Sequence, residues 1–485
     1  MAKNPERARQ SANLYETVAE ELSQMIRVGV LKPGDRLPSL REVCNRRAVS
    51  QSTVMQAFAV LEHQGLIEAR ARRGYFVSHR RMTSDADQMA QAQEHAKVQS
   101  VDVSELVFHI LDATRARKLL PFGSAFPSPA LFPLPELATA LARSVRHMDP
   151  WSTVTDLPPG NDLLRQEISR RYLTQGVNVM PDDILITNGA MEALSLSLEA
   201  VAPRGSLVAI ESPAFYGALQ CIERLGLNVV LVPTDPIRGV RPDALRRIID
   251  TQPVTACWFM SHFQNPLGAS IPDEARSEIV SMLAERDIPL IEDDVYAELY
   301  FSDRAPGSFK SFDAADLVLH CGSFSKCLAP GYRVGWVASH RYGRSLTRLK
   351  SMSSMATSIP AQGALAQYLQ RSGRYDKHLR KLRSRLASQQ DAMLSAMTEF
   401  FPEGTTATRA EGGYFTWVSL PNRLDVLQLH RLATAEGIGI SPGPMFSPDR
   451  NFSNCMRMNF GHPWGPELQT GIERLGALAH KLVRS

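Results

Sequence analysis

Apolar residues near the start of the chain recur first at helical and then at strand spacing. Leu14–Val28 carries them three and four positions apart, which predicts a helix. Ser39 and Ser50 each precede another stretch with one apolar face, where an N-cap is expected. Two short strand-like runs follow, at Leu66–Glu68 and Tyr75–Val77. The pattern predicts three helices and a two-stranded ribbon, which together form a small domain over residues 12–80.

A change of pattern separates this head from the rest of the chain. Residues 79–104 are polar and rich in Gln and Ala, and we interpret residues 81–115 as a linker without a site. From residue 116 to the end, short apolar runs alternate with helical stretches, which predicts an α/β body with a mostly parallel sheet covered on both faces. The runs are Ile184–Thr187, Leu207–Ile210, Val229–Val232, Ala256–Met260, Ile288–Ile291, Leu317–Cys321 and Val334–Ala338.

The last part of the body, from Ile359, changes again. A long basic helical stretch covers Tyr375–Leu394, and strand-like runs follow at Gly413–Val418 and Met456–Phe460. This order predicts a smaller C-terminal α+β lobe. A chain of 485 residues is long enough for two or three domains of this kind.

Composition narrows the class of protein. Apolar residues make up 44% and charged residues 21%, as in ordinary globular proteins, and no apolar run reaches the roughly 20 residues that span a bilayer. The six cysteines form no CxxC pair, which argues against a disulfide framework or a cysteine-rich zinc site and favours a reduced, cytoplasmic compartment. We therefore expect no membrane partner and no metal.

Charge is divided unevenly between the head and the body. Residues 1–82 hold 14 Lys and Arg against 8 Asp and Glu, a net of +6, whereas residues 83–485 hold 40 against 42, a net of −2. A basic head on a near-neutral body suggests a polyanion partner for the head alone, although a basic face is often only solvated.

The head has the residues that a helix-turn-helix uses on double-stranded DNA. Such a motif places the N-terminal end of its second helix in the major groove. Here that end carries short or amide-bearing side chains that can contact bases or phosphates: Ser50, Gln51, Ser52 and Thr53. Arg41 on the preceding helix, and Arg72 and Arg73 in the ribbon tip, can reach phosphates. For Ser50 alone we favour capping, but for the whole set we favour DNA contact.

Lys326 has the most informative surroundings in the body. It follows the apolar run Leu317–Cys321, and Ser323, Ser325 and Arg333 flank it. A lysine that forms a Schiff base needs a lowered pKa, which burial and a nearby cation supply. Hydroxyls and a guanidinium are the donors that a phosphate needs. This loop therefore predicts that pyridoxal 5'-phosphate is attached to Lys326.

Other strand ends supply the remaining groups that this cofactor requires. Its ring nitrogen must stay protonated, which calls for a buried carboxylate such as Asp293 after an apolar run. Tyr296, three residues on, can hydrogen-bond the phenolic oxygen, and Asn265 adds an amide at another strand end. The segment Thr187–Leu194 turns from strand to helix, whose first amides suit a phosphate. Each feature alone could be a cap or a turn, so their order along the chain carries the argument.

The head resembles the winged-helix domain of GntR-family repressors over about Leu14–Val77. Four separated signatures occur in order, at Leu37–Glu42, Val49–Val54, Gly65–Ile67 and Arg73–Val77. Gln51 departs from the arginine that is common in the family, which implies a different operator preference.

The body resembles fold-type-I aminotransferases of class I/II over roughly residues 120–480. The resemblance implies an α/β fold in which Lys326 carries the cofactor, Asp293 pairs with its ring nitrogen, and Tyr296 and Asn265 hold its phenolic oxygen. It also implies that Phe215 stacks on the ring, that Ser323, Ser325, Arg333 and the amides of Ala190 and Met191 grip the phosphate, and that Arg457 clamps a substrate carboxylate. Thr155 stands where these enzymes usually supply a tyrosine across the dimer, and Ala125 where a glycine is common. Because of both departures, we expect less efficient amino-acid turnover than in these enzymes.

A GntR-like head on such a body resembles the MocR subfamily of bacterial regulators. The resemblance implies a homodimer that binds DNA and senses an amine or amino acid through its aminotransferase-like part, with residual transaminase chemistry in some members. The alternative is a metabolic aminotransferase whose DNA-binding head is auxiliary, and the full set of cofactor residues keeps this alternative open.

Overall fold

The structure is a computed structural model, and it describes residues 5–27, 31, 35–47, 49–63, 66–70, 74–77, 98–114, 119–371 and 373–484. The chain divides into two compact units, residues 1–84 and 85–485, and each is considered by itself. None of the helices in the described ranges is long and apolar enough to cross a membrane.

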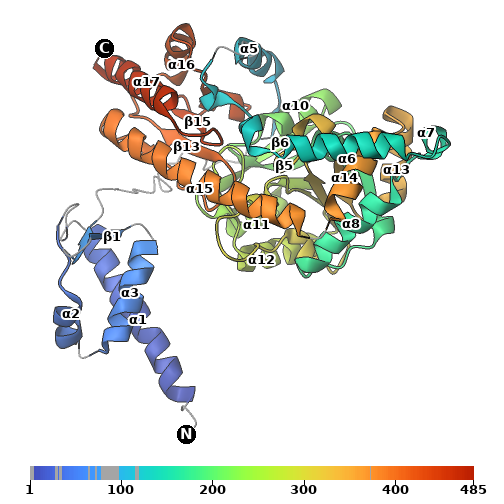
Figure 1. The fold of residues 1–485 in the computed structure, drawn as a ribbon. Coiled ribbons are helices and arrows are strands. Elements are labelled where there is room, and N and C mark those ends of the chain that lie inside the picture. The colour runs from blue at the N-terminus through green and yellow to red at the C-terminus, as the bar shows by residue number, and fades with distance from the viewer. Residues whose placement is uncertain are drawn as a thin grey trace. The chain divides into compact units, whose positions relative to one another are not determined.

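The head contains three helices and a two-stranded antiparallel ribbon, which confirms the predicted order of elements (Figure 1). The elements are α1 (Pro5–Arg27), α2 (Leu40–Arg47), α3 (Gln51–His63), β1 (Ile67–Arg70) and β2 (Gly74–Val77). Ser39 caps α2 through a reciprocal pair of bonds with Glu42, and Ser50 Oγ accepts the Thr53 amide at 3.2 Å at the start of α3. Val18, Phe58 and Ile67 belong to one buried core that joins helices and ribbon.

A nine-stranded sheet forms the centre of the body (Figure 1). Along its main path the strands run in the order β3-β6-β5-β8-β9-β10-β11-β4, and β7 pairs with β6. The five adjacent strands β6, β5, β8, β9 and β10 are parallel to one another, whereas β11 is antiparallel to both β10 and β4. The strands are β3 (Gln99–Ser100), β4 (Ile184–Thr187), β5 (Leu207–Ser212), β6 (Asn228–Asp235), β7 (Gly239–Val240), β8 (Val254–Phe259), β9 (Leu290–Asp293), β10 (Val318–Ser323) and β11 (Gly335–Ala338). All seven apolar runs identified in the sequence are strands of this sheet.

Helices cover both faces of the sheet because alternate strand residues point to opposite sides. Val208 and Ile210 of β5 share a core with α9 and α10, whereas Leu207 and Ala209 share another with α11 and α12. The helices of this part are α5 (Ser104–Thr114), α6 (Leu134–Arg146), α7 (Ser152–Thr155), α8 (Asp162–Thr174), α9 (Ala190–Val201), α10 (Tyr216–Leu225), α11 (Pro242–Thr251), α12 (Asp273–Ala284), α13 (Gly343–Ser353) and α14 (Ile359–Leu369).

Residues 98–114 pack on the body, although their segment was assigned to the linker. Gln99 and Ser100 pair with the edge strand β6, and the side chains of Val103, Val107 and Ile110 are buried in a body core. These few apolar residues were too sparse in a polar segment to be recognised as core positions. The remainder of the predicted linker falls largely outside the described residues.

The C-terminal lobe is a four-stranded antiparallel sheet with helices, as predicted. Its strand order is β12-β13-β15-β14. The elements are α15 (Arg374–Phe400), β12 (Thr406–Ala407), β13 (Phe415–Ser419), α16 (Val426–Ala435), β14 (Ser441–Pro442), β15 (Cys455–Asn459) and α17 (Pro466–Arg484). The lobe shares a continuous core with α8 and α14 of the large domain, so the two parts of the body are packed together.

Candidate functional site

Lys326 lies just beyond β10, with its amine among groups that disfavour its charge. Burial first, and then the cations of Arg457 and Arg333, lower its pKa to about 7, while the nearby Asp293 acts in the opposite direction. The amine donates to the carbonyl oxygen of Ala125 at 3.1 Å and lies 4.1 Å from the centre of the Phe126 ring. A substantial fraction of this amine is therefore uncharged near neutral pH, which a Schiff-base nucleophile requires.

Asp293, at the end of β9, presents an oxygen without a hydrogen-bond partner. Its side chain is buried, and Oδ1 accepts no hydrogen bond of good geometry from the described residues, although the Val295 amide and the Trp258 indole lie near enough to the carboxyl group to lower its pKa. Burial and the neighbouring Asp294 raise its pKa to about 7, opposed by the charge of Lys326. A buried carboxylate oxygen without a donor fits a protonated pyridine nitrogen, because that group supplies both the donor and the compensating charge.

Asn265 and Tyr296 each keep a side-chain hydrogen-bond donor. Both are buried. The Asn265 Oδ1 atom accepts a bond from Arg457 Nη1 at 2.9 Å, which fixes the amide orientation and leaves Nδ2 as the donor. Burial raises the pKa of the Tyr296 hydroxyl, which therefore keeps its proton. This pair suits the phenolic oxygen of the cofactor.

The start of α9, the loop after β10 and Arg333 form a cradle of hydrogen-bond donors. Gly189, with φ 81°, precedes Ala190 at the helix start. A Cβ at Gly189 would lie 2.5 Å from Arg333 Nη2, so only glycine lets the guanidinium approach the helix N-terminus. Arg333 Nη1 donates to Ser325 Oγ at 3.2 Å, and Ser325 Oγ lies 3.0 Å from Ser323 Oγ. Amides, hydroxyls and a guanidinium at one point match the donors that a phosphate takes.

Met191 and Phe215 lie beside each other at the edge of this cradle. A Cβ at Gly217 would lie 2.6 Å from the Phe215 ring and 3.3 Å from Met191 Cε, so both side chains converge on that glycine. The Phe215 ring is half-buried, which leaves a face on which an aromatic cofactor can stack. Contacts thus link Lys326 with Asp293, Arg333, Arg457 and Tyr296, Arg457 with Asn265, and Phe215 with Met191, whereas the binding of the cofactor by these residues stays a prediction.

Arg457, in β15, is a buried cation whose hydrogen-bond partners are neutral. It is 1% exposed, and its Nη atoms donate to Asn265 Oδ1, the Gly123 carbonyl at 2.8 Å and Ser441 Oγ at 3.2 Å. Among the described residues no carboxylate forms an ion pair with it, and Nε has no partner. Burial lowers its pKa. A buried guanidinium in this state is suited to bind an anion.

Residues 120–127, which we name the strap, link these groups through backbone carbonyls. Besides the bonds of Arg457 and Lys326 described above, Tyr414 Oη donates to Ala125 O at 3.2 Å. Asn459 Nδ2 donates to the carbonyls of Ser124 and Phe126 at 2.9 and 2.8 Å. Tyr414 and Asn459 lie in the predicted strand runs Gly413–Val418 and Met456–Phe460, but the sequence assigned them no role, because their role depends on tertiary contacts.

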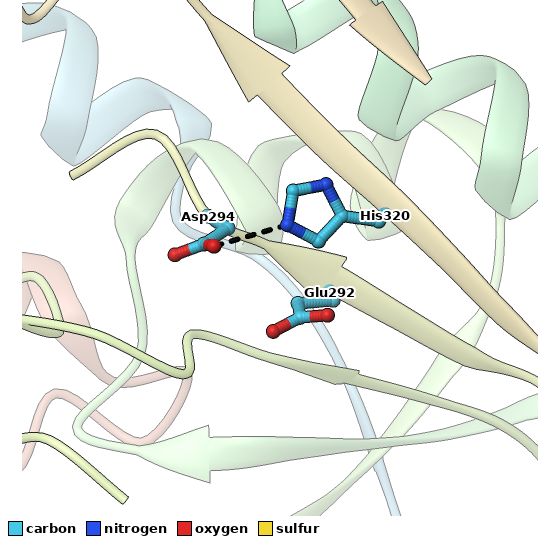
Figure 2. Close-up of side chains that lie close together, drawn as sticks. All are labelled: Glu292, Asp294 and His320. Atoms are coloured by element: carbon cyan, nitrogen blue, oxygen red, sulfur yellow. Dashed lines mark hydrogen bonds and ion pairs between the residues drawn. The ribbon is translucent and has the colours of Figure 1, made fainter. Parts of the chain in front are cut away.

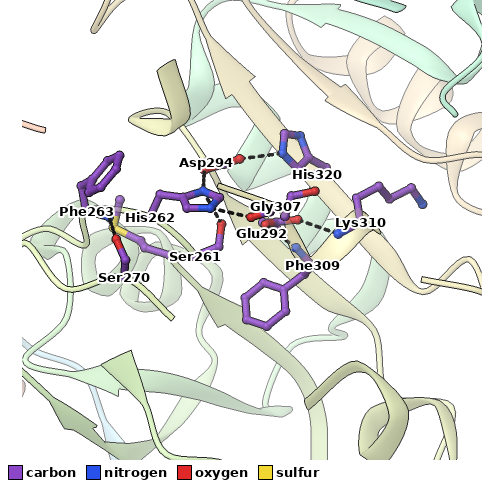
Figure 3. A network of polar contacts seen from close by, with 12 residues as sticks. Ser261, His262, Phe263, Ser270, Glu292, Asp294, Gly307, Phe309, Lys310 and His320 are labelled. Atoms are coloured by element: carbon purple, nitrogen blue, oxygen red, sulfur yellow. Dashed lines mark hydrogen bonds and ion pairs between the residues drawn. The ribbon is translucent and has the colours of Figure 1, made fainter. Parts of the chain in front are cut away.

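A second group missed from the sequence lies behind Asp293. Glu292, Asp294 and His320 are buried and their ligand-type atoms lie within 4.8 Å of one another, as in a metal site (Figure 2). However, both Glu292 oxygens accept backbone amides, of Phe309 at 2.8 Å and Lys310 at 3.1 Å. His320 Nε2 lies 3.0 Å from Asp294 Oδ2, and His262 Nδ1 lies 2.6 Å from Asp294 Oδ1 (Figure 3). We therefore interpret the cluster as a hydrogen-bonded network of the protein's own groups.

The predicted DNA-contacting residues of the head divide into two groups. Gln51 and Arg41 are exposed, so their side chains can reach a ligand, and Ser52 is exposed with its hydroxyl 2.8 Å from Ser50 Oγ. Thr53 is 7% exposed, and its hydroxyl lies 2.7 Å from Ser50 Oγ, so these two hydroxyls are engaged at the helix start. Arg72 and Arg73 lie outside the described residues.

A hollow in the head's surface adds a residue that sequence reasoning did not identify. It measures about 670 Å³, and its lining includes Arg36 and Tyr75 as well as Arg41 and Gln51. The proximity of two arginines to the start of α3 is consistent with a surface for a polyanion. Arg36 stands in the turn before Ser39, outside the helices and the ribbon tip from which a helix-turn-helix pattern predicts contacts.

Comparison with known proteins finds a matching family for each of the two parts of the chain. Residues 14–77 match the family described as bacterial regulatory proteins, gntR family, and residues 123–475 match aminotransferase class I and II. The HTH-type transcriptional regulators YdcR and YjiR of Escherichia coli (strain K12) are 42% and 32% identical to this chain. The YdcR match covers 96% of this chain and 98% of YdcR, and the YjiR match 97% and 99%.

Solved structures support the assignment of the body. A multiple substrate aminotransferase from Thermococcus profundus superposes with a TM-score of 0.73 at 27% identity, over 79% of this chain and 96% of that one. The fold and the cradle thus define the body as a fold-type-I, class I/II aminotransferase-like domain, a family that implies dependence on pyridoxal phosphate. With its winged-helix head, the chain belongs to the MocR subfamily of GntR-type transcription regulators.

Proposed function

We propose that this regulator carries pyridoxal phosphate on Lys326 and uses it to sense a primary amine or amino acid, which changes how the head binds DNA. One observation carries the proposal. A lysine amine with a lowered pKa lies with a buried carboxylate and a phosphate cradle, in a chain that also has a DNA-binding head. When bound, pyridoxal phosphate supplies an aldehyde that reacts with primary amines and a ring that withdraws electrons.

The residues of the chain would hold the cofactor at each of its polar groups. Asp293 Oδ1 would accept the proton-bearing ring nitrogen, and Asn265 and Tyr296 would donate to the phenolic oxygen. Phe215 would stack on the ring. The phosphate would be held by Ser323, Ser325, Arg333 and the amides of Ala190 and Met191.

Arg457 would hold the carboxylate of an amino-acid effector and thereby link the site to the strap. An anion bound to its Nη2 would compete with the Gly123 carbonyl for the same donor. The strap is the part of the body that follows α5 in the chain, and the head precedes both. A ligand shifts a conformational equilibrium only if it binds two arrangements of the protein with unequal affinity. Arrangements in which the Gly123 carbonyl does or does not occupy Arg457 Nη2 would differ in their affinity for an anion.

An exposed apolar segment supports a dimer. Trp151, Val154 and Leu157 in and around α7 are 72%, 65% and 51% exposed. Contiguous exposed apolar surface is typical of a protein interface, and we propose that these three side chains form such a surface. A second copy of this chain is the partner that the family resemblance implies. DNA binding would place this dimer in the cytoplasm.

A metabolic aminotransferase remains the second candidate, because the cofactor residues are complete. Thr155 and Ala125, which depart from the enzyme pattern, favour the regulator. The two candidates differ in turnover. We expect the protein to bind specific DNA next to its own gene and to transaminate a panel of amino acids well below the roughly 1–1000 per second of ordinary enzymes. Ordinary turnover without any DNA preference would favour the enzyme.

The head should divide its contacts between affinity and specificity. We expect Arg41→Ala to weaken binding to all duplexes alike and to reduce the salt dependence of binding, because it removes one phosphate contact. Gln51→Ala should instead alter the preferred base, with a cost of about 1–3 kcal/mol on the cognate site. Mobility-shift titrations at several salt concentrations distinguish the two effects. Arg409→Ala, an exposed arginine of the C-terminal lobe, is the matched control.

A further inference from the structure

The network behind the cofactor site places one carboxylate between two histidines. Asp294 follows Asp293 directly, and its two oxygens contact His262 Nδ1 at 2.6 Å and His320 Nε2 at 3.0 Å (Figure 3). His262 is 1%, His320 5% and Asp294 6% exposed, so water contributes little to their solvation. A buried carboxylate in such surroundings needs a counter-charge from the protein.

The hydrogen-bond partners of His262 determine how many protons it shares with Asp294. Nε2 lies 2.6 Å from the carbonyl oxygen of Gly307, which can only accept, so Nε2 carries a proton. Nδ1 faces a carboxylate oxygen at 2.6 Å, and this contact also requires a proton between the two atoms. The Ser261 hydroxyl, 3.1 Å from Nδ1, can accept from it as well. The pair of His262 and Asp294 therefore holds two protons and is electrically neutral.

The other side of Asp294 is satisfied without an additional charge. Trp336 Nε1 donates to Tyr172 Oη at 2.9 Å, and Tyr172 Oη lies 2.6 Å from His320 Nδ1. Burial raises the pKa of Tyr172, so its hydroxyl keeps the proton and can donate it to Nδ1. His320 Nε2 then donates to Asp294. Burial opposes a charge on His320, whereas Glu292 and Asp294 favour one and raise its pKa. With Nδ1 occupied as an acceptor, every hydrogen of this arrangement has an acceptor and the His320 ring is neutral. Arg276 adds positive charge near Asp294 without a hydrogen bond to it, so His262 is the hydrogen-bonded counter-charge.

This charge balance bears on the carboxylate of the cofactor site. Two adjacent buried carboxylates oppose each other's ionisation, and Asp294 contributes to the raised pKa of Asp293. We infer that His262 is a positioning residue for the cofactor, whose proton neutralises Asp294 so that Asp293 can remain ionised and pair with the protonated ring nitrogen. The inference rests on the proposed function, since it assumes that pyridoxal phosphate binds at Lys326.

Removing the charge of His262 while keeping its hydrogen bond to Gly307 tests the inference. In His262→Gln, the amide nitrogen can still donate to Gly307, but the amide oxygen faces the Asp294 carboxylate. We expect the dissociation constant for pyridoxal phosphate, measured by absorbance titration of the apoprotein, to rise about tenfold or more, since one pKa unit corresponds to a tenfold change.

A second substitution distinguishes charge compensation from packing. In Asp294→Asn the carboxylate charge is absent, and a neutral His262 can accept from the new amide, so we expect little loss. In the double variant, the introduced asparagine donates to the oxygen of the introduced glutamine and accepts from His320, which reproduces the hydrogen bonds without charge. Cofactor affinity should return to within about twofold of wild type, the usual scatter of independent effects.

The possible outcomes separate clearly. If the losses of the two single variants add in the double variant, His262 acts through packing and the inference is wrong. If His262→Gln binds the cofactor as wild type does, it is also wrong. Should His262→Gln not fold, the double variant must recover the wild-type melting temperature of the apoprotein, and failure to do so contradicts the charge argument. Failure of the wild-type protein itself to bind pyridoxal phosphate would instead refute the proposed function.

Discussion

Lys326→Ala protein is expected to retain no covalently attached pyridoxal phosphate. Borohydride reduction of the loaded wild-type protein should trap the cofactor on an amine, and peptide mass mapping should place the pyridoxyl group on Lys326. The reason is the lowered pKa of this amine, about 7, beside Asp293 and the phosphate cradle. The variant should show no such label, and its absorbance should respond to amines no more than that of free pyridoxal phosphate.

Other lysines provide the controls for this result. Lys310 donates to Asp313 and Asp316 at 2.8 and 3.0 Å, and Lys350 donates to Glu192 at 2.8 Å, so carboxylates already engage both amines. Lys377→Ala, at an exposed position of α15, should label as wild type does. A stoichiometric label on Lys310 or Lys350 would refute the assignment of Lys326.

Arg457→Ala should lower affinity for amino acids far more than affinity for the corresponding decarboxylated amines. Removal of a buried, hydrogen-bonded charge partner costs about 2–5 kcal/mol, which corresponds to at least roughly a 30-fold loss. Amines lack the carboxylate, so their affinity should fall only as far as the loss of the Arg457 side chain disturbs the strap. The measurement is an absorbance titration of the cofactor-loaded variant with matched pairs of amino acid and amine.

A conservative variant makes this comparison independent of stability. Arg457→Lys keeps the charge but not the planar pair of donors, so its discrimination between amino acid and amine should lie between those of wild type and Arg457→Ala. Equal losses for both ligand classes would show that Arg457 supports the structure only, through Gly123 and Asn265.

Much of the architecture could be predicted because its signals are local. Buried parallel strands are short apolar runs, and a site at the carboxyl edge of such a sheet uses the residues that follow those runs, as Asp293 and Asn265 do. The caps at Ser39 and Ser50 likewise depend on their immediate neighbours. Lys326 was recognised because its loop carries Ser323, Ser325 and Arg333 within a few positions.

What could not be predicted depends on distant parts of the chain. His320 reaches Asp294 because β9 and β10 pair with His320 opposite Glu292, a register that no local pattern reveals. His262 joins them from the segment after β8. Asn459 and Tyr414 contact the strap across more than 280 positions of sequence, and their residue types are common in strands without any such role. Tertiary contacts alone give these residues their function.

Ligand binding in the body is expected to change DNA binding by the head. The most direct test is a mobility-shift titration of the full-length, cofactor-loaded protein on the promoter region beside its gene, with and without the amine or amino acid that shifts its absorbance. We expect this ligand to change specific DNA affinity in the wild-type protein and to leave that of Lys326→Ala unchanged. Wild-type affinity that stays constant at saturating ligand, while the absorbance confirms binding, would contradict it.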